Sequence, residues 1–163
     1  MTGVQTCALP ISLQFDGVAD AVVVDETVLN PADGTFSIFA WIKGGAPGQT
    51  IVSQVEGTGW LMADPSQGAL MTALAPPAGR KAIPPLVSEV PITDGNWHRI
   101  GFVWDGATRA LYVDETRVAE DAQPNLAPCT GGLHIGCDED QSPARFFAGV
   151  IDGVRIYNRP VRR

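Results

Sequence analysis

Acidic side chains are the residues of this chain whose type could support hydrolysis. Cleaving a glycosidic bond takes two carboxyl groups that a rigid element holds about 5–10 Å apart. Glu115, Glu120 and Asp121 fall in or beside predicted turns, as does the run Asp138–Asp140. Their spacing does not place a pair on one face of a strand, where side chains recur every second residue. The carboxylates therefore argue against hydrolysis.

Nucleophilic catalysis is not indicated either. The chain has 2 histidines, and no Gly-x-Ser-x-Gly motif presents a serine at a strand-to-helix turn. His98 alternates with Ile100 and Phe102, which predicts a half-buried structural histidine. His134 lies between glycines in a short strand-like run, where we expect a solvent-exposed or edge position. We therefore predict that the protein is not an enzyme.

The cysteines leave two alternatives open. Cys129 and Cys137 flank Thr130–Gly136, and a continuous strand would hold them roughly 26 Å apart at about 3.3 Å per residue. A disulfide needs Cα atoms within about 7 Å, so it requires the segment to fold back at Gly131-Gly132. Two separate thiols are the simpler interpretation. Zinc is not indicated, because no Cys-x-x-Cys pair or paired histidines accompany the two cysteines.

Tryptophans are the candidates for a ligand platform, because glycans commonly stack on an exposed aromatic ring with polar groups around it. Of the 4 tryptophans, Trp41 and Trp104 lie in or at the end of dense apolar runs, which predicts core positions. Trp97 stands at the start of a predicted strand. Trp60 is flanked by glycines in the run EGTGWLMAD, so it is the candidate ligand-binding residue. The alternative for Trp60 is burial, which is usual for tryptophan.

Short strands must position all of these residues. The run 94–114, DGNWHRIGFVWDGATRALYVD, alternates on both sides of Asp105-Gly106 and predicts an antiparallel hairpin. Phe36–Lys43 is apolar on both alternating sets, which predicts a strand covered on both faces. Similar runs recur between turns, and no amphipathic helix pattern appears. The sequence predicts an all-β sandwich of antiparallel sheets, either immunoglobulin-like or a jelly roll.

Length and charge limit the possible partners. The 163 residues are enough for one domain and few for two. A net charge of −7 without any basic cluster disfavours nucleic acid, whose phosphates an acidic surface repels. No apolar run approaches the roughly 20 residues that cross a bilayer, so we expect no membrane insertion.

Residues 1–11 differ from the rest of the chain. They read MTGVQTCALPI and have neither the basic start nor the apolar stretch of a signal peptide. Thr2–Ile11 resembles the translation of a common sequencing adapter. We therefore expect a non-native leader over residues 1–11, which makes Cys7 foreign to the native chain. We expect one domain over residues 12–163, as a fragment of a longer protein with neighbouring domains.

Six segments, taken in order, suggest a family. They are LQFDG at Leu13–Gly17, FSIFAWIK at Phe36–Lys43, GNWHRIGFVWDG at Gly95–Gly106, LYVD at Leu111–Asp114, GGLHIG at Gly131–Gly136 and GVIDGVRIYNR at Gly149–Arg159. Together they resemble the laminin-G-like branch of the concanavalin A-like lectin/glucanase superfamily. The resemblance implies a two-sheet antiparallel jelly-roll sandwich.

The resemblance also implies a function. It suggests a non-catalytic carbohydrate- or protein-binding module, lectin-like, of an extracellular or cell-surface protein, with a glycan or an extracellular protein as partner. Superfamily enzymes that cut β-glucans carry a Glu-x-Asp-x-x-Glu strand, which this chain lacks. A ligand-free structural spacer and a divergent glycoside hydrolase remain as alternatives.

Calcium is the metal that the resemblance implies. In related glucanases and lectins the terminal strands pair, and a calcium site often lies where they meet. Asp16 and Asp152 are the candidate ligands, because calcium prefers carboxylate and carbonyl oxygens. Asp16 could instead cap its own Asp-Gly turn, and Asp152 could pair with Arg155 or accept backbone hydrogen bonds. The acidic run at Cys137–Asp140 is expected to be a solvated loop, because it lacks the spaced ligands of an EF-hand; calcium binding by this loop is the alternative.

Overall fold

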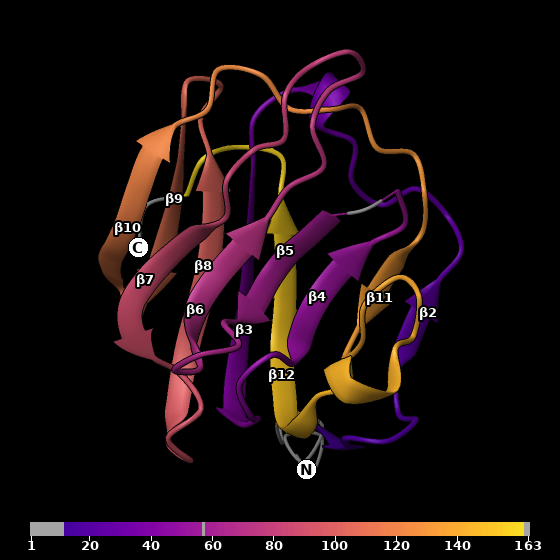
Figure 1. Ribbon diagram of the computed structural model, residues 1–163, viewed down its shortest axis with the longest axis vertical. Coiled ribbons are helices and arrows are strands. Elements are labelled where there is room, and N and C mark those ends of the chain that lie inside the picture. Colours follow the sequence, from indigo (N-terminus) through magenta and orange to yellow (C-terminus); the bar gives the residue numbers. More distant parts are fainter. Residues whose placement is uncertain (1–11, 57, 162–163) are drawn as a thin grey trace, which may run out of the picture.

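The computed structural model describes residues 12–56 and 58–161, which form two six-stranded antiparallel sheets packed face to face (Figure 1). One sheet has the order β1-β12-β3-β8-β9-β10 and lies behind; the other has the order β2-β11-β4-β5-β6-β7 and lies in front. We call them the β3 sheet and the β5 sheet. The predicted jelly-roll sandwich is therefore confirmed, and the strands that are neighbours in space are often distant in sequence.

The strands are short, as the turn-rich sequence predicts. They are β1 (Leu13–Asp16), β2 (Val22–Val24), β3 (Phe36–Gly44), β4 (Thr50–Gln54), β5 (Thr58–Ala63), β6 (Ala69–Ala73), β7 (Leu86–Pro91), β8 (Trp97–Trp104), β9 (Thr108–Val113), β10 (Thr116–Ala122), β11 (Leu133–Ile135) and β12 (Ala148–Tyr157). Among the described residues the helices are two single turns, η2 (Pro31–Asp33) and η3 (Pro143–Arg145). None of the helices there has the length or apolarity to cross a bilayer.

The predicted hairpin is β8 and β9. Trp104 pairs with Arg109 across the turn, where Asp105 accepts hydrogen bonds from the backbone N–H groups of Ala107 and Thr108 at 3.0 and 2.8 Å. Gly106 has φ +93°, a conformation that glycine adopts without strain. The Asp-Gly pair therefore predicted the turn correctly: Asp105 accepts the backbone hydrogen bonds of the turn, and Gly106 adopts its positive φ.

The core lies between the two sheets. Alternation along β3 directs Phe36, Ile38 and Ile42 inward, where each is at most 1% exposed. Phe36 meets Trp60 of the opposite sheet edge to face, with ring centroids 5.2 Å apart. Phe102 of β8 contacts both rings, so the aromatic centre of the core joins the two sheets.

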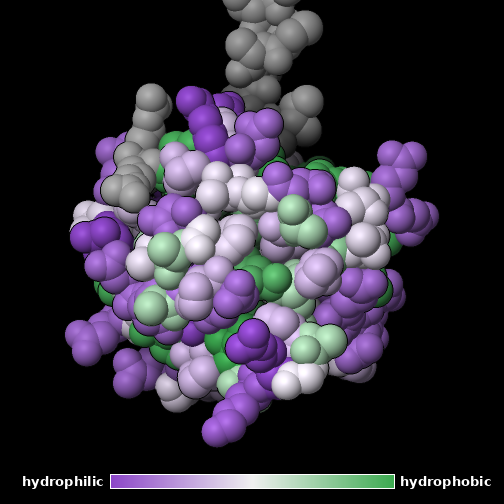
Figure 2. Space-filling model, turned by 90° about the horizontal axis from the view of Figure 1, so that it is seen from above, coloured by the Kyte–Doolittle hydropathy of each residue, from purple (hydrophilic) through white to green (hydrophobic). Residues whose placement is uncertain are grey.

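The two terminal strands pair with each other. β1 runs antiparallel to β12, with Leu13 opposite Ile151 and Asp16 opposite Ala148. β12 also pairs with β3, so the last strand of the domain lies between β1 and β3, one strand in from the edge of the sheet. Seen from above, the end of the sandwich is mostly hydrophilic, and hydrophobic side chains appear there only as small patches (Figure 2).

Candidate functional site

Trp60 is not the exposed platform that its glycine neighbours suggested. Its side chain is 1% exposed, and its indole Nε1–H donates a 3.0 Å hydrogen bond to Gln54 Oε1. The register of β5 shifts between Gly59 and Met62, and Met62 fills the space outside Gly59. Trp60 is therefore a core residue, and the expectation that its ring is exposed as a ligand platform is wrong.

Trp41, and not Trp60, has an exposed ring. The prediction of a core Trp41 is wrong: it is 43% exposed, because β3 directs Phe36, Ile38 and Ile42 to the interior and its alternate residues to the outer face. Trp104 is in the core as predicted, and its indole N–H donates to the carbonyl of Gln123 at 2.8 Å. The outer face of the β3 sheet thus carries an open aromatic ring.

A pocket of about 390 Å³ lies beside Trp41 on this outer face. Trp41, Arg99, Asp152 and Arg155 contribute its exposed walls, with Gly153, Phe39 and Ala40 completing the lining. Trp41 pairs with Arg99 of β8 on one side and with Asp152 of β12 on the other. We call this site the Trp41 platform: one exposed ring flanked by two guanidinium groups and one carboxylate.

An irregularity in β12 shapes the platform. The pairing of β12 with β3 shifts between Asp152 and Arg155, as in a β-bulge, which bends a strand and changes the direction of its side chains. Gly153 has φ +56°, and a Cβ added there would lie 3.6 Å from Trp41 Cδ1. The irregularity therefore places a residue without a side chain next to the indole ring, where even one added carbon would touch it.

A second aromatic cluster supports one side of the platform. Phe39 lies against Gly101, with the Arg99 guanidinium carbon 4.4 Å from the centre of its ring. The rings of Tyr112 and Tyr157 follow at centroid distances of 6.3 and 6.4 Å. Phe39 is 2% exposed, so the outer face is covered around Phe39 and open around Trp41.

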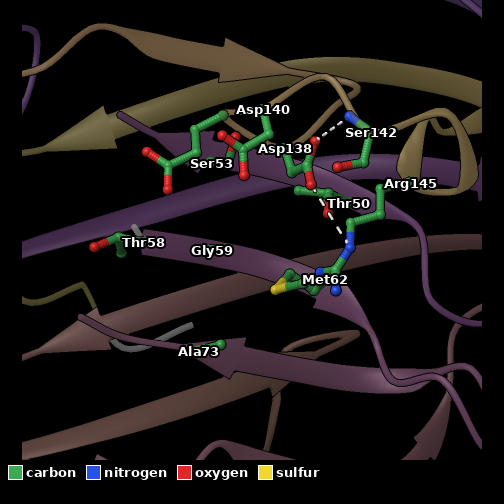
Figure 3. A pocket seen from close by; sticks show the side chains of 11 residues that line it. Thr50, Ser53, Thr58, Gly59, Met62, Ala73, Asp138, Asp140, Ser142 and Arg145 are labelled. Atoms are coloured by element: carbon green, nitrogen blue, oxygen red, sulfur yellow. Dashed lines mark hydrogen bonds and ion pairs between the residues drawn. The ribbon is translucent and has the colours of Figure 1, made fainter. Parts of the chain in front are cut away.

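The second pocket lies on the outer face of the β5 sheet (Figure 3). It measures about 270 Å³; its floor comes from β4, β5 and β6, and its rim is the acidic run with η3. The lining residues are Thr50, Ser53, Thr58, Gly59, Met62, Ala73, Asp138, Glu139, Asp140, Ser142 and Arg145. We call it the acidic-loop pocket. The acidic run is therefore one wall of a cavity, not only a solvated loop.

Hydrogen bonds hold the acidic loop in place. Asp138 accepts the backbone N–H of Ser142 at 2.8 Å and lies 3.6 Å from Arg145 Nε. Glu139 accepts the backbone N–H of Glu56 at 2.7 Å, which ties the loop to the end of β4. The first two carboxylates of the run are thus partly engaged in fixing the loop itself.

The two predicted calcium ligands do not meet. Asp16 accepts hydrogen bonds from the backbone N–H groups of Val18, Ala19 and Asp20 at 2.8–3.1 Å. These bonds, that of Ala19 first, lower the pKa of Asp16, as expected of a carboxylate that caps its own turn. Asp16 lies opposite Ala148 of β12. Asp152 comes four residues after Ala148, which places it about 13 Å further along the strand at about 3.3 Å per residue.

The described residues therefore do not fit a calcium ion shared by Asp16 and Asp152. Across residues 12–56 and 58–161, no three His, Cys, Asp or Glu side chains are grouped to hold a metal ion. Asp152 belongs instead to the Trp41 platform.

Both histidines are structural. His98 bonds Asp114 through Nδ1 at 2.8 Å and Asp94 through Nε2 at 2.9 Å. Burial lowers the pKa of His98, but the hydrogen bonds to Asp114 and then Asp94 raise it by more, so the net effect is a raised pKa. His134 is 6% exposed within β11, between β2 and β4, so the prediction of a solvent or edge position is wrong. Its ring instead faces Cys137 and the carbonyl of Asp138.

The cysteines are separate thiols, the simpler of the two alternatives. Cys129 and Cys137 are both free and buried. The Cys129 thiol donates to the carbonyl of Val55 at 3.0 Å, and burial raises its pKa to about 11. Such a thiol is unreactive at neutral pH, because the thiolate is the reactive form.

The family model for Laminin_G_3, concanavalin A-like lectin/glucanases superfamily, matches residues 16–163. The chain therefore belongs to this family. The adapter-like residues 1–11 lie outside the described residues. No individual curated protein matches the chain in sequence.

Solved structures share the fold at low identity. The heptameric SAP-like pentraxin of Limulus polyphemus has 14% identity and a TM-score of 0.64, over 93% of this chain and 77% of that one. Domain 4 of AbnA, an extracellular arabinanase of Geobacillus stearothermophilus, solved with arabinotriose, has 14% identity and a TM-score of 0.66, over 92% and 71%. Domains LG4-5 of the mouse laminin α1 chain have 13% sequence identity and a TM-score of 0.68, over 90% of this chain and 41% of that one.

Proposed function

We propose that this protein is a non-catalytic carbohydrate-binding module of an exported or cell-surface protein, with its glycan on the Trp41 platform. The observation that carries the proposal is the 43% exposed Trp41 beside a pocket with Arg99, Asp152 and Arg155. The face of an indole ring packs against the C–H face of a sugar, and the charged groups bond its hydroxyls.

Two further points support a glycan. The Trp41 ring lines a pocket together with charged side chains, and exposed apolar surface rimmed by polar groups is typical of ligand-binding grooves. AbnA domain 4, which shares the fold, was solved with arabinotriose, so this sandwich can carry a sugar chain. A stable protein partner would cover roughly 800 Å² of this chain, whereas the observation that carries the proposal is a single pocket.

Glycan-array screening followed by calorimetry tests the proposal, with arabino-oligosaccharides among the probes. We expect Trp41→Ala to weaken binding at least about tenfold: stacking of a base on an aromatic ring is worth roughly 1–3 kcal/mol, and we expect a sugar face to contribute a similar amount. Trp41→Phe should retain part of the affinity. Trp97→Ala measures how far the glycan extends, because Trp97 is 44% exposed on the same outer face, opposite Lys43, but does not line the pocket; its effect should be smaller than that of Trp41→Ala.

Three results would contradict the proposal. If no glycan binds the wild-type domain, the structural-spacer alternative gains support. If glycans bind equally well to Trp41→Ala, the site lies elsewhere. Release of reducing sugar that Asp152→Asn abolishes would instead favour the glycoside hydrolase alternative.

A further inference from the structure

The acidic-loop pocket lies on the opposite sheet from the Trp41 platform and is not explained by glycan stacking. Thr50, Ser53 and Met62 come from the outer face of the β5 sheet, and no aromatic side chain lines the cavity. A ligand of this pocket would therefore differ in chemistry from one that stacks on Trp41.

Its floor contains an unsatisfied hydroxyl group. Thr50 is 0% exposed, and its Oγ1 has no hydrogen-bond partner among the described residues. Thr50 pairs with Met62 of β5, and both side chains line the pocket. Neighbouring Ser53 is satisfied, because its Oγ donates to the carbonyl of Cys137 at 2.7 Å. A buried unpaired hydroxyl is unfavourable, so Thr50 indicates a missing polar partner.

The rim of the pocket has an excess of negative charge. Three carboxylates, Asp138, Glu139 and Asp140, face one guanidinium group, that of Arg145. The distance of 3.6 Å between Asp138 and Arg145 exceeds that of a tight charge-assisted hydrogen bond, about 2.7–2.9 Å, and Arg145 is half exposed. Asp140 makes no hydrogen bond or ion pair within residues 12–56 and 58–161. Arg145 therefore neutralises the rim only in part.

The shape of the site favours an organic cation over a metal ion. The described carboxylates do not converge in a group of three around one point, as a bare ion needs. A primary ammonium group has three donors that reach different acceptors, such as a carboxylate and a hydroxyl. Met62 and Ala73 provide apolar surface for the methylene carbons next to such a nitrogen.

We propose that the acidic-loop pocket binds a protonated primary amine, with the ammonium group between Asp140 and Thr50. Figure 3 shows the carboxylates of Asp138 and Asp140 above the strand that carries Gly59, with Arg145 approaching from the other side. Two sources share this chemistry, an amino sugar and a lysine side chain. The volume of about 270 Å³ lies just below the roughly 300–1,000 Å³ of drug-sized ligand pockets, which favours a small group such as either of these.

Titrations followed by NMR on the whole chain distinguish the sources. Glucosamine and Nα-acetyl-lysine methylamide are the two probes, and each is paired with its Nε- or N-acetylated neutral form. We expect each neutral form to bind at least about tenfold more weakly, since a charge-assisted hydrogen bond is about twice as strong as one between neutral groups. The tighter of the two amines identifies the source. Equal binding of charged and neutral forms would overturn the proposal.

Variants locate the binding at the pocket. Asp140→Asn should weaken amine binding about tenfold, as for loss of one charged contact. The matched control Asp25→Asn removes an exposed carboxylate elsewhere and should leave affinity unchanged. Arg145→Gln should strengthen binding by removing the internal competitor. Weaker binding by Arg145→Gln, or equal loss in Asp140→Asn and Asp25→Asn, would contradict a cation site here.

Thr50→Val separates a ligand role from a structural role. Valine has nearly the same shape and no hydroxyl, so the free protein should unfold at an equal or higher temperature. The same variant should bind the amine more weakly. A lower unfolding temperature together with unchanged affinity would show that the hydroxyl serves the fold, and the proposal would fail.

Discussion

The two faces of the β3 sheet are both aromatic, but they differ in what covers them. On the inner face, Ile38, Ile42 and Phe102 are 0% exposed beneath the β5 sheet. On the outer face, Phe39 is 2% exposed, whereas Trp41 is 43% exposed on the same strand. The difference shows that aromatic content alone does not decide burial. A second layer decides it, and the outer face has such a layer only in part.

The partial layer consists of local side chains and the end of the domain. Tyr157 and Val161 pack on the cluster around Phe39. Among residues 12–56 and 58–161, Trp41 remains 43% exposed, and at the β12 irregularity it is faced by Gly153, which has no side chain. One face therefore serves stability along its whole length. The other serves stability at one end and, by our proposal, binding at the other.

Replacement of the inner Trp60 should have the largest effect on stability. Trp60→Ala removes a 1% exposed indole and leaves Gln54 Oε1 without its donor. We expect a loss of about 3–5 kcal/mol in the free energy of unfolding, measured by urea titration. A loss below about 1 kcal/mol would mean that the core collapses around the site, and the contrast between the faces would weaken.

Overpacking of the outer cluster should have an intermediate effect. A Cβ at Gly101 would lie 2.2 Å from Phe39 Cε1, so Gly101→Ala must displace the ring. We expect a cost of about 1–3 kcal/mol in urea unfolding. In a Phe39→Ala background the same change should cost much less, because the clashing atoms are gone. Additive costs would show that Phe39 does not depend on Gly101.

The fold was largely predictable from the sequence, because its signals are local. The hairpin at Asp105-Gly106 depends on one turn, and the alternation in Phe36–Lys43 assigns each side chain to one of two faces. Alternation does not say which face a second layer covers. Trp41 was therefore placed in the core and Trp60 at the surface, the reverse of what the structure has.

Contacts between distant strands were harder to predict. The pairing of β1 with β12 followed from the family resemblance, but its register was not encoded in any local pattern. That register separates Asp16 from Asp152 and brings Asp152 to Trp41 instead. The irregularities in β5 and β12 also interrupt the alternation of side chains between the two faces of the sheet. In the sequence such an irregularity is marked by a glycine such as Gly153. Because the chain has 18 glycines, a single one does not identify the irregular position.

The inner face ends at an ionisable group, His98, whose effect on stability should be smaller. Folding raises the pKa of His98 above its ordinary value of 6.5, so its contribution is complete below pH 6.5 and is lost as pH rises further. The N–H of Asn96 and then His98 lower the pKa of Asp94 from 3.8 to about 2, so its contribution is lost as pH falls from about 4 to 2.

Urea midpoints measured across this pH range test that expectation. Stability should be highest between about pH 4 and 6.5, where imidazolium and carboxylates coexist. His98→Gln should flatten the decline above pH 6.5. Asp114→Asn should move the decline to lower pH, because one of the bonds that raise the pKa of His98 is gone. A wild-type midpoint that rises between pH 6 and 8 would contradict the imidazolium assignment.

Replacement of the open outer ring should have the smallest effect on stability. Trp41→Ala removes a side chain that is already 43% exposed, and the Cβ of alanine keeps the strand geometry of β3. We expect a change within about 0.5 kcal/mol in urea unfolding, as for other surface substitutions. The same variant should nevertheless lose glycan binding. If Trp41→Ala instead destabilised the protein as strongly as Trp60→Ala, the ring would have to be covered in solution, and the outer face would be a second core.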